Sequence, residues 1–350
     1  LNEEGKRNVA IGANAHAMNK FKSQLVAVGD SALYNNGFGA IGDQATNNTA
    51  IGSKSLFGNM SGSLNTSVGS SALMNNTNAS SNTAVGAKTL LSNTTGSNNT
   101  GVGANALIDN VSGGNNSAIG VSALSNNTIG DYNTALGSES MIYNTSGTYN
   151  TAIGQGALVL NETGNYNVAL GARSLSFAVK HGNVGIGYEA LYTNGIGYSN
   201  VGVGMHALFS NTTASNLVAI GDSALYKNGI GATGSQASFN TAIGSKALYA
   251  NTIGKENTAT GFESLRSNIS GNDNTAVGYK ALVTNTLGSQ NTAIGRVAML
   301  SNVDGTGNTA LGNYVIFNNI SGDLNTAVGN LALNANISGS YNTTVGSESM

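Results

Sequence analysis

Cysteine, proline and tryptophan are absent from the 350-residue chain, and charged residues make up only 9% of it. The absence of cysteine excludes disulfide scaffolds, thiol catalysis and cysteine-ligated metals. The formal net charge of −2 gives no basic footprint for nucleic acid and no polybasic patch for a membrane surface. The N-terminal segment is polar and no apolar stretch follows it, so the sequence shows neither a signal peptide nor a membrane helix.

Glycine and asparagine are abundant, with 49 and 53 residues, and this bias is typical of a repeat protein. The phrase Asn-Thr-Ala-(Ile/Val)-Gly recurs, mostly every 17 residues, in about 20 copies. These copies fill residues 1–350 as a single repeat array and leave no room for a separate catalytic domain. The closing glycines are Gly12, Gly29, Gly52, Gly69, Gly86, Gly103, Gly120, Gly137, Gly154, Gly171, Gly187, Gly204, Gly221, Gly244, Gly261, Gly278, Gly295, Gly312, Gly329 and Gly346.

A longer pattern lies over the repeat. The segment 25–34 returns almost unchanged as 217–226, which is 192 residues later. A 6-residue insertion follows each copy, near 37–42 and near 229–234. We infer that a block of repeats was duplicated.

Most repeats have an aliphatic residue before the closing glycine, with Thr260 as the clear exception, and a leucine or methionine four residues after it. Asn/Gly/Ser turns separate these apolar positions. These segments are too short for amphipathic helices, and each glycine in a helix would cost about 1 kcal/mol relative to alanine. A unit this small must bury its apolar side against its neighbours. The sequence therefore predicts an all-β fold, a parallel β-solenoid or left-handed β-roll of about 20 coils that lie about 4.8 Å apart.

In such a stack, equivalent residues form columns along the coils. We predict that the aliphatic and leucine columns are internal rows, and that the asparagines are ladders whose amides hydrogen-bond to the next rung, as in cross-β structures. These residues are structural, and we expect no catalytic, cofactor-binding or metal-binding residues. The predicted rows contain Val85, Val102, Ile119, Leu90, Leu107 and Leu124, beside the glycines Gly86, Gly103, Gly120 and Gly137. The predicted ladders contain Asn82, Asn99, Asn116, Asn133 and Asn150, and Asn93, Asn110, Asn127 and Asn144.

Small and charged residues occupy other columns. Alanine and glycine flank the aliphatic column, as at Ala84 and Gly86, and strand alternation puts them on the opposite face. Such a face suits close lateral packing of chains; alternatively, alanine and glycine fill the tight interior of a thin single-chain solenoid. Charged residues such as Lys88, Glu139 and Arg173 lie two positions after a closing glycine, where we expect solvent-facing corners.

The phrase Asn-Thr-Ala-Ile-Gly-x-x-Ala-Leu, as in 240–248, resembles the head repeats of trimeric autotransporter adhesins, the YadA-like head. The insertion residues 39–45 match the shorter phrase of that family. The resemblance implies a left-handed β-roll, three chains side by side and a bacterial cell surface. Similar arrays occur in phage tail fibres. The 17-residue unit is longer than the usual head repeat, and the chain contains no stalk heptads or membrane anchor.

Four motifs allow other interpretations. Residues 37–42 and 229–234 match the dinucleotide fingerprint GxGxxG, but we expect another β-coil after each of them instead of the required helix. The histidines have no carboxylate and nucleophile at catalytic spacing. The threonine column could form an ice-binding face, but its partner column is mixed. Nine asparagines of the second ladder stand in Asn-x-Ser/Thr sequons, which can carry glycans in secreted eukaryotic proteins, but turn formation is the favoured explanation: Asn59, Asn93, Asn110, Asn144, Asn161, Asn211, Asn268, Asn319 and Asn336.

We therefore expect a non-enzymatic extracellular structural or adhesive fibre segment without a cofactor. The alternatives are a phage tail-fibre shaft and a self-assembling extracellular filament subunit. The expected partners are copies of the chain, as a trimer by resemblance or joined end to end, and a matrix or cell-surface ligand. The expected location is extracellular or on the cell surface, bacterial by resemblance, with the virion as the alternative.

Overall fold

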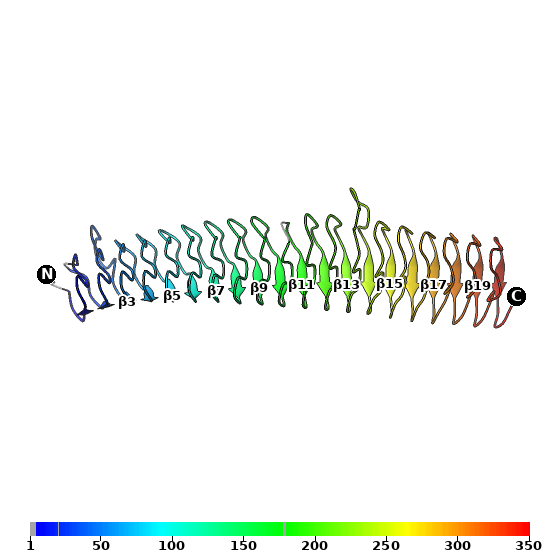
Figure 1. Cartoon of the computed structure of the whole chain (residues 1–350), viewed down its shortest axis with the longest axis horizontal. Coiled ribbons are helices and arrows are strands. Elements are labelled where there is room, and N and C mark those ends of the chain that lie inside the picture. Colours follow the sequence, from blue (N-terminus) through cyan, green and yellow to red (C-terminus); the bar gives the residue numbers. More distant parts are fainter. Residues whose placement is uncertain (1–4, 20, 178–179) are drawn as a thin grey trace. The chain divides into compact units, whose positions relative to one another are not determined.

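The computed structural model describes residues 5–19, 21–177 and 180–350, and within them the chain forms short strands and turns without a helix. It divides into two compact units, Leu1–Ala172 and Arg173–Met350. Each unit is a stack of coils with one three-residue strand per coil (Figure 1). The predicted all-β parallel β-solenoid with a repeat of about 17 residues is confirmed. The left-handed sense of the coil stays a prediction.

The strands follow the repeat through both units. The first unit contains β1 (Val9–Ile11), β2 (Val26–Val28), β3 (Thr49–Ile51), β4 (Thr66–Val68), β5 (Thr83–Val85), β6 (Thr100–Val102), β7 (Ser117–Ile119), β8 (Thr134–Leu136), β9 (Thr151–Ile153) and β10 (Val168–Leu170). The second contains β11 (Val184–Ile186), β12 (Val201–Val203), β13 (Val218–Ile220), β14 (Thr241–Ile243), β15 (Thr258–Thr260), β16 (Thr275–Val277), β17 (Thr292–Ile294), β18 (Thr309–Leu311), β19 (Thr326–Val328) and β20 (Thr343–Val345).

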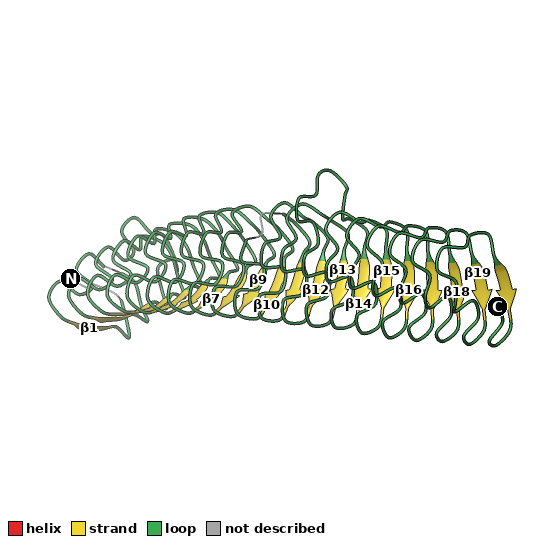
Figure 2. Cartoon of the chain, turned by 45° about the vertical axis from the view of Figure 1, so that its right-hand side comes forward, coloured by secondary structure: helices red, strands yellow, loops and turns green. Residues whose placement is uncertain are grey.

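Neighbouring strands within each unit pair in parallel and in register, as the repeat predicts. In the first unit Val85 pairs with Val102, and Val102 pairs with Ile119. In the second unit Thr275 pairs with Thr292 in the same way. Equivalent residues of successive repeats therefore lie one above another in columns (Figure 2).

Each strand from β2 to β20 buries its middle residue and turns its first and third residues outward. Ala84 and Ala118 have no exposed surface, whereas Val85 is 38% and Ile119 is 43% exposed. The prediction that Val85, Val102 and Ile119 form an internal row was wrong: they form a column, but on the outside. The leucine row was predicted correctly, because Leu90, Leu107 and Leu124 are fully buried.

The narrow interior explains this inversion. At Gly101, which occupies the alanine column, a Cβ atom would lie 2.6 Å from Cγ2 of Thr89 and 3.6 Å from Cδ1 of Leu90. The space inside the strand therefore takes a methyl group or less, and a branched side chain has to point outward. Alanine fills the tight interior of a single chain, as in the alternative interpretation of the small residues. The alanine column is consequently covered within its own chain, and the trimer implied by resemblance stays a prediction.

A glycine ends every strand because the backbone there has a conformation that other residues rarely adopt. Gly86 has a φ of +136°, and a Cβ atom on it would lie 2.7 Å from the carbonyl carbon and oxygen of Gly103 in the next coil. At Gly120 the corresponding distance to the carbonyl oxygen of Gly137 is 2.4 Å. Both backbone strain and steric contact therefore require glycine in this column.

The corner after this glycine continues the hydrogen-bond ladder between coils. Lys88 and Leu90 have φ values of 57° and 53°, in the left-handed region. Lys88 N–H donates to the carbonyl of Ser70 in the preceding coil (2.9 Å), and Leu90 N–H donates to that of Ala106 in the following coil (3.0 Å). The left-handed conformation of a leucine costs about 1–2 kcal/mol. Full burial of its side chain contributes about 1.5–3 kcal/mol and offsets this cost.

The orientation of the strands can be tested at two adjacent residues. Ala118→Ile forces extra methyl groups into the filled interior and should lower the free energy of unfolding by about 1–3 kcal/mol. Ile119→Thr changes an outward residue to the one found naturally at Thr260, and its effect should stay within about 0.5 kcal/mol. Urea denaturation of both variants measures the difference, and a larger loss for Ile119→Thr would contradict the observed orientation.

Candidate functional site

The first asparagine ladder connects each coil to the next through both side-chain and backbone groups. Asn116 Oδ1 accepts a hydrogen bond from the backbone N–H of Asn133, the next rung (2.9 Å). Its Nδ2 donates to the carbonyl of Gly130 on the opposite wall of the interior (2.8 Å). The backbone N–H of Asn116 donates in turn to Oδ1 of Asn99 (2.9 Å). Asn82, Asn99, Asn133 and Asn150 make the same contacts and have no exposed surface.

The second ladder joins side chain to side chain. Asn110 Nδ2 donates to Oδ1 of Asn93 in the preceding coil (2.7 Å) and to the carbonyl of Gly113 in its own turn (2.9 Å). Its Oδ1 accepts from Nδ2 of Asn127 (2.7 Å), and Asn144 continues the series. These four side chains are fully buried. The predicted asparagine ladders are therefore present, and they lie inside the coil beside the buried leucines.

Among the described residues, nearly every buried side-chain nitrogen and oxygen atom of the asparagines has a hydrogen-bond partner. A buried amide without partners is costly, and native interiors avoid it. Within the part of the chain that the structure describes, only Asn19 among the asparagines has a buried side-chain atom without a partner, its Oδ1. The buried ladder asparagines therefore contribute stacking contacts, and their amides are not free to bind a ligand.

The same burial decides between the two interpretations of the sequons. Asn93 Nδ2 already donates to Asn76 Oδ1 (3.1 Å) and to the Gly96 carbonyl (2.9 Å), so a glycan on this nitrogen would have to break the ladder. Asn336 is partly exposed. The other eight sequon asparagines are fully buried in the folded chain: Asn59, Asn93, Asn110, Asn144, Asn161, Asn211, Asn268 and Asn319.

The two GxGxxG segments form turns that extend out of the coil. In the first unit, Asn36 closes its turn by donating to the carbonyl of Ala45 (2.9 Å), and the next element is strand β3. Asn59 still donates to Asn36 Oδ1 across the insertion (2.7 Å), so the second ladder continues. The equivalent loop between β13 and β14 projects beyond the neighbouring turns (Figures 1 and 2). The expected β-coil follows both insertions, and the helix that a dinucleotide site needs does not.

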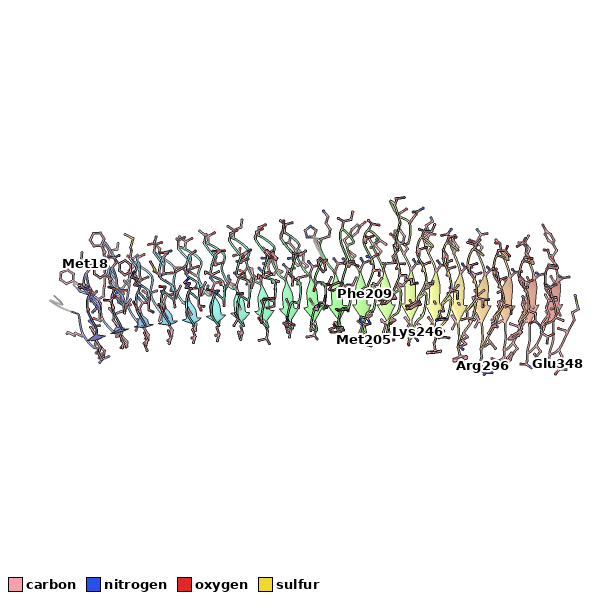
Figure 3. All side chains as sticks on the ribbon, viewed as in Figure 1. Met18, Met205, Phe209, Lys246, Arg296 and Glu348 are labelled. Atoms are coloured by element: carbon pink, nitrogen blue, oxygen red, sulfur yellow. The ribbon has the colours of Figure 1, made fainter. Side chains whose placement is uncertain are left out.

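Several charged side chains lie on the corner after the strands, as the sequence predicts, and others lie in the second turn, as at Lys255 and Glu256. In the second unit the side chains of Lys246, Arg296 and Glu348 extend from this edge (Figure 3). Lys280 and Glu263 form an ion pair of 3.5 Å across neighbouring coils. Such pairs are partly exposed and contribute about 0–1 kcal/mol each.

One corner cluster contains a histidine. Glu189 accepts from Nη1 of Arg173 (2.7 Å) and lies 3.3 Å from Nε2 of His206. Arg173 also donates to the hydroxyl of Tyr192 (2.5 Å). Of the other histidines, His16 replaces the core leucine of the first coil, where burial lowers its pKa. Among residues 5–19, 21–177 and 180–350, no group of three His, Asp or Glu side chains could hold a metal ion.

Aromatic side chains stack along the second unit. Tyr192, Phe209, Tyr226 and Tyr249 form a column with ring centroids 5.1–5.2 Å apart and interplanar angles of 3–12°. Phe209 is labelled in Figure 3. Because the rings face one another, the ring faces between neighbours are covered. The column therefore stabilises neighbouring coils by about 0.5–1.5 kcal/mol per pair.

A comparison of the chain with protein-family models, with curated proteins and with solved structures gives no match. Over the described residues, no helix has the length and apolar character needed to cross a membrane.

Two neighbouring asparagines allow a matched test of the ladder. Asn116→Ser leaves the Asn133 N–H without its partner and removes one of the two side-chain donors to the Gly130 carbonyl, which should cost about 1–3 kcal/mol. Asn115 is exposed, and its column contains Ser81 naturally, so Asn115→Ser should change stability by less than about 0.5 kcal/mol. Thermal and urea unfolding of the two variants are compared with the unmodified chain. Equal stability of both variants would show that the ladder contributes nothing.

Proposed function

We propose that the chain is a non-enzymatic structural and adhesive segment of an extracellular fibre on a bacterial surface. Its stacked coils act as a spacer and present a repetitive surface for attachment to cells or matrix. The proposal rests on one observation, the double asparagine ladder that recurs from coil to coil in both units. The resemblance of Asn-Thr-Ala-Ile-Gly to adhesin head repeats supports it.

The direction of the hydrogen bonds gives the ladder a mechanical role. Within each unit, hydrogen bonds between coils run along the stacking direction, as between Thr83 N–H and the Asn99 carbonyl (2.8 Å) and between Thr94 N–H and the Val111 carbonyl (2.9 Å). Asn99 and Asn110 add side-chain bonds to the preceding rung. A pull along the stack therefore loads all the bonds between two coils together, which is the property a load-bearing spacer needs.

Pulling the full chain from its two ends in a single-molecule force experiment tests the mechanical part of the proposal. Coils should detach one after another, and each 17-residue coil should release about 50–60 Å of contour length. Asn116→Ser should lower the force of the weakest step, and Asn115→Ser should not. Complete unravelling at forces typical of unstructured polypeptides would contradict the spacer role.

Attachment needs a separate measurement. Beads coated with the full chain should resist detachment by flow from mammalian cells or matrix-coated glass, compared with beads coated with albumin. Retention no better than that of the albumin beads would refute the adhesive part and leave the mechanical part to stand on the force experiment.

A further inference from the structure

The outer face of the strands has a composition unlike the rest of the surface. In all twenty strands the first and third residues are Thr, Ser, Val, Ile or Leu, so the face contains no charge. The third residues are aliphatic except Thr260, and the first residues form two runs of hydroxyls. The run in the first unit contains Thr49, Thr66, Thr83, Thr100, Ser117, Thr134 and Thr151, and the run in the second contains Thr241, Thr258, Thr275, Thr292, Thr309, Thr326 and Thr343.

The hydroxyls of these strand threonines are free, whereas three threonines in the turn after the second asparagine ladder use theirs in hydrogen bonds. Thr94, Thr128 and Thr145 each donate a side-chain hydrogen bond of 2.9–3.0 Å to a carbonyl of the next coil. Across residues 5–19, 21–177 and 180–350, by contrast, the first-position threonines of the two runs make no side-chain hydrogen bond with the protein, although they lie in equally regular columns. Their hydroxyls face solvent at partly or fully exposed positions, as at Thr275 and Thr309.

The columns place hydroxyl and methyl groups on a regular net. Neighbouring strands lie about 4.8 Å apart, and the first and third residues of a strand are about 6.6 Å apart. Threonine, valine and isoleucine are branched at Cβ and have few rotamers, so their groups keep fixed positions. In the second unit, the strands from β14 to β19 lie side by side in one row (Figure 1). Thr258 and Thr260 give β15 a hydroxyl at both positions.

This combination fits one kind of ligand. A dry protein interface would bury the free hydroxyls without partners, which is unfavourable. Contact with bulk water is also unfavourable for this face, because aliphatic side chains of the third-residue column, Ile243, Ile294 and Leu311, are about 40% exposed. An ordered water lattice satisfies both columns, since its molecules bond to the hydroxyls and enclose the methyl groups. The prism faces of hexagonal ice have oxygen atoms on a rectangular net of comparable spacings, and they are uncharged like this face.

We propose that the outer strand face of each unit, in the runs 49–153 and 241–345, binds the surface of ice. In the sequence, the absence of a second threonine column argued against an ice-binding face. In the structure, the aliphatic third residues of the strands supply methyl groups on the same net as the threonine methyls. The inference goes beyond the proposed function and does not depend on it, because ice adsorption can be measured on the chain alone.

The test places a charge in the middle of each run. The face variant is Thr100→Lys with Thr292→Lys, and a second disruption without charge is Thr100→Tyr with Thr292→Tyr. The control variant is Ser122→Lys with Ser223→Lys, because the same corner column contains Lys88 and Lys246 naturally. Each fluorescently labelled full chain is presented to a growing single ice crystal, and its incorporation and inhibition of ice recrystallisation are measured. Circular dichroism and light scattering check the fold and the oligomeric state.

The unmodified chain and the control variant should be incorporated into ice on defined planes, and both face variants should lose incorporation while they stay folded. Exclusion of the unmodified chain from ice, like that of an unrelated protein, would overturn the proposal. Incorporation of both face variants at the unmodified level would also overturn it. If the face variants lose self-association while the unmodified chain shows no ice adsorption, the face binds a second copy of the chain and the ice proposal fails.

Discussion

A side-chain amide buried in a protein interior must have both its N–H groups and its oxygen hydrogen-bonded, because an unpaired group costs about 1–3 kcal/mol. In this chain the partners of a buried amide lie in the adjacent coils. Asn110 donates to Asn93, accepts from Asn127 and closes its own turn at Gly113. One coil therefore cannot satisfy its own interior, and stacking at a fixed register is the arrangement that does so. The in-register columns follow from this requirement.

The amides and glycines also set the width of the coil. The glycine column brings the backbones of neighbouring coils together, and the two ladders occupy part of the interior. In the strands only alanine, glycine and other small residues fit in what is left, opposite the row of buried leucines. Branched aliphatic residues are consequently displaced to the outer face beside the threonines, where they make a regular uncharged surface. The surface proposed to bind ice is thus a consequence of how the interior is built.

The period, the strands, the parallel pairing, the leucine row and both asparagine ladders could be predicted from the sequence, because each depends on spacing. The side on which Val85 lies could not. Alternation along a strand separates Ala84 from Val85, but hydrophobicity wrongly assigned the larger side chain to the core. The deciding quantity is the distance across the coil at Gly101, which no pattern in the chain reveals. The left-handed conformation of Leu90 was equally hidden, because leucine rarely adopts it, although its burial was predictable.

Hydrogen exchange of the asparagine side-chain NH2 groups, followed by NMR, tests the central role of the ladders most directly. The amides of Asn93, Asn110 and Asn127 should exchange far more slowly than that of exposed Asn115, because both N–H groups of each buried amide are hydrogen-bonded and exchange only when neighbouring coils open. If the side-chain amides of the ladder exchange as fast as that of Asn115, the coils are held together by something other than the stacked asparagines.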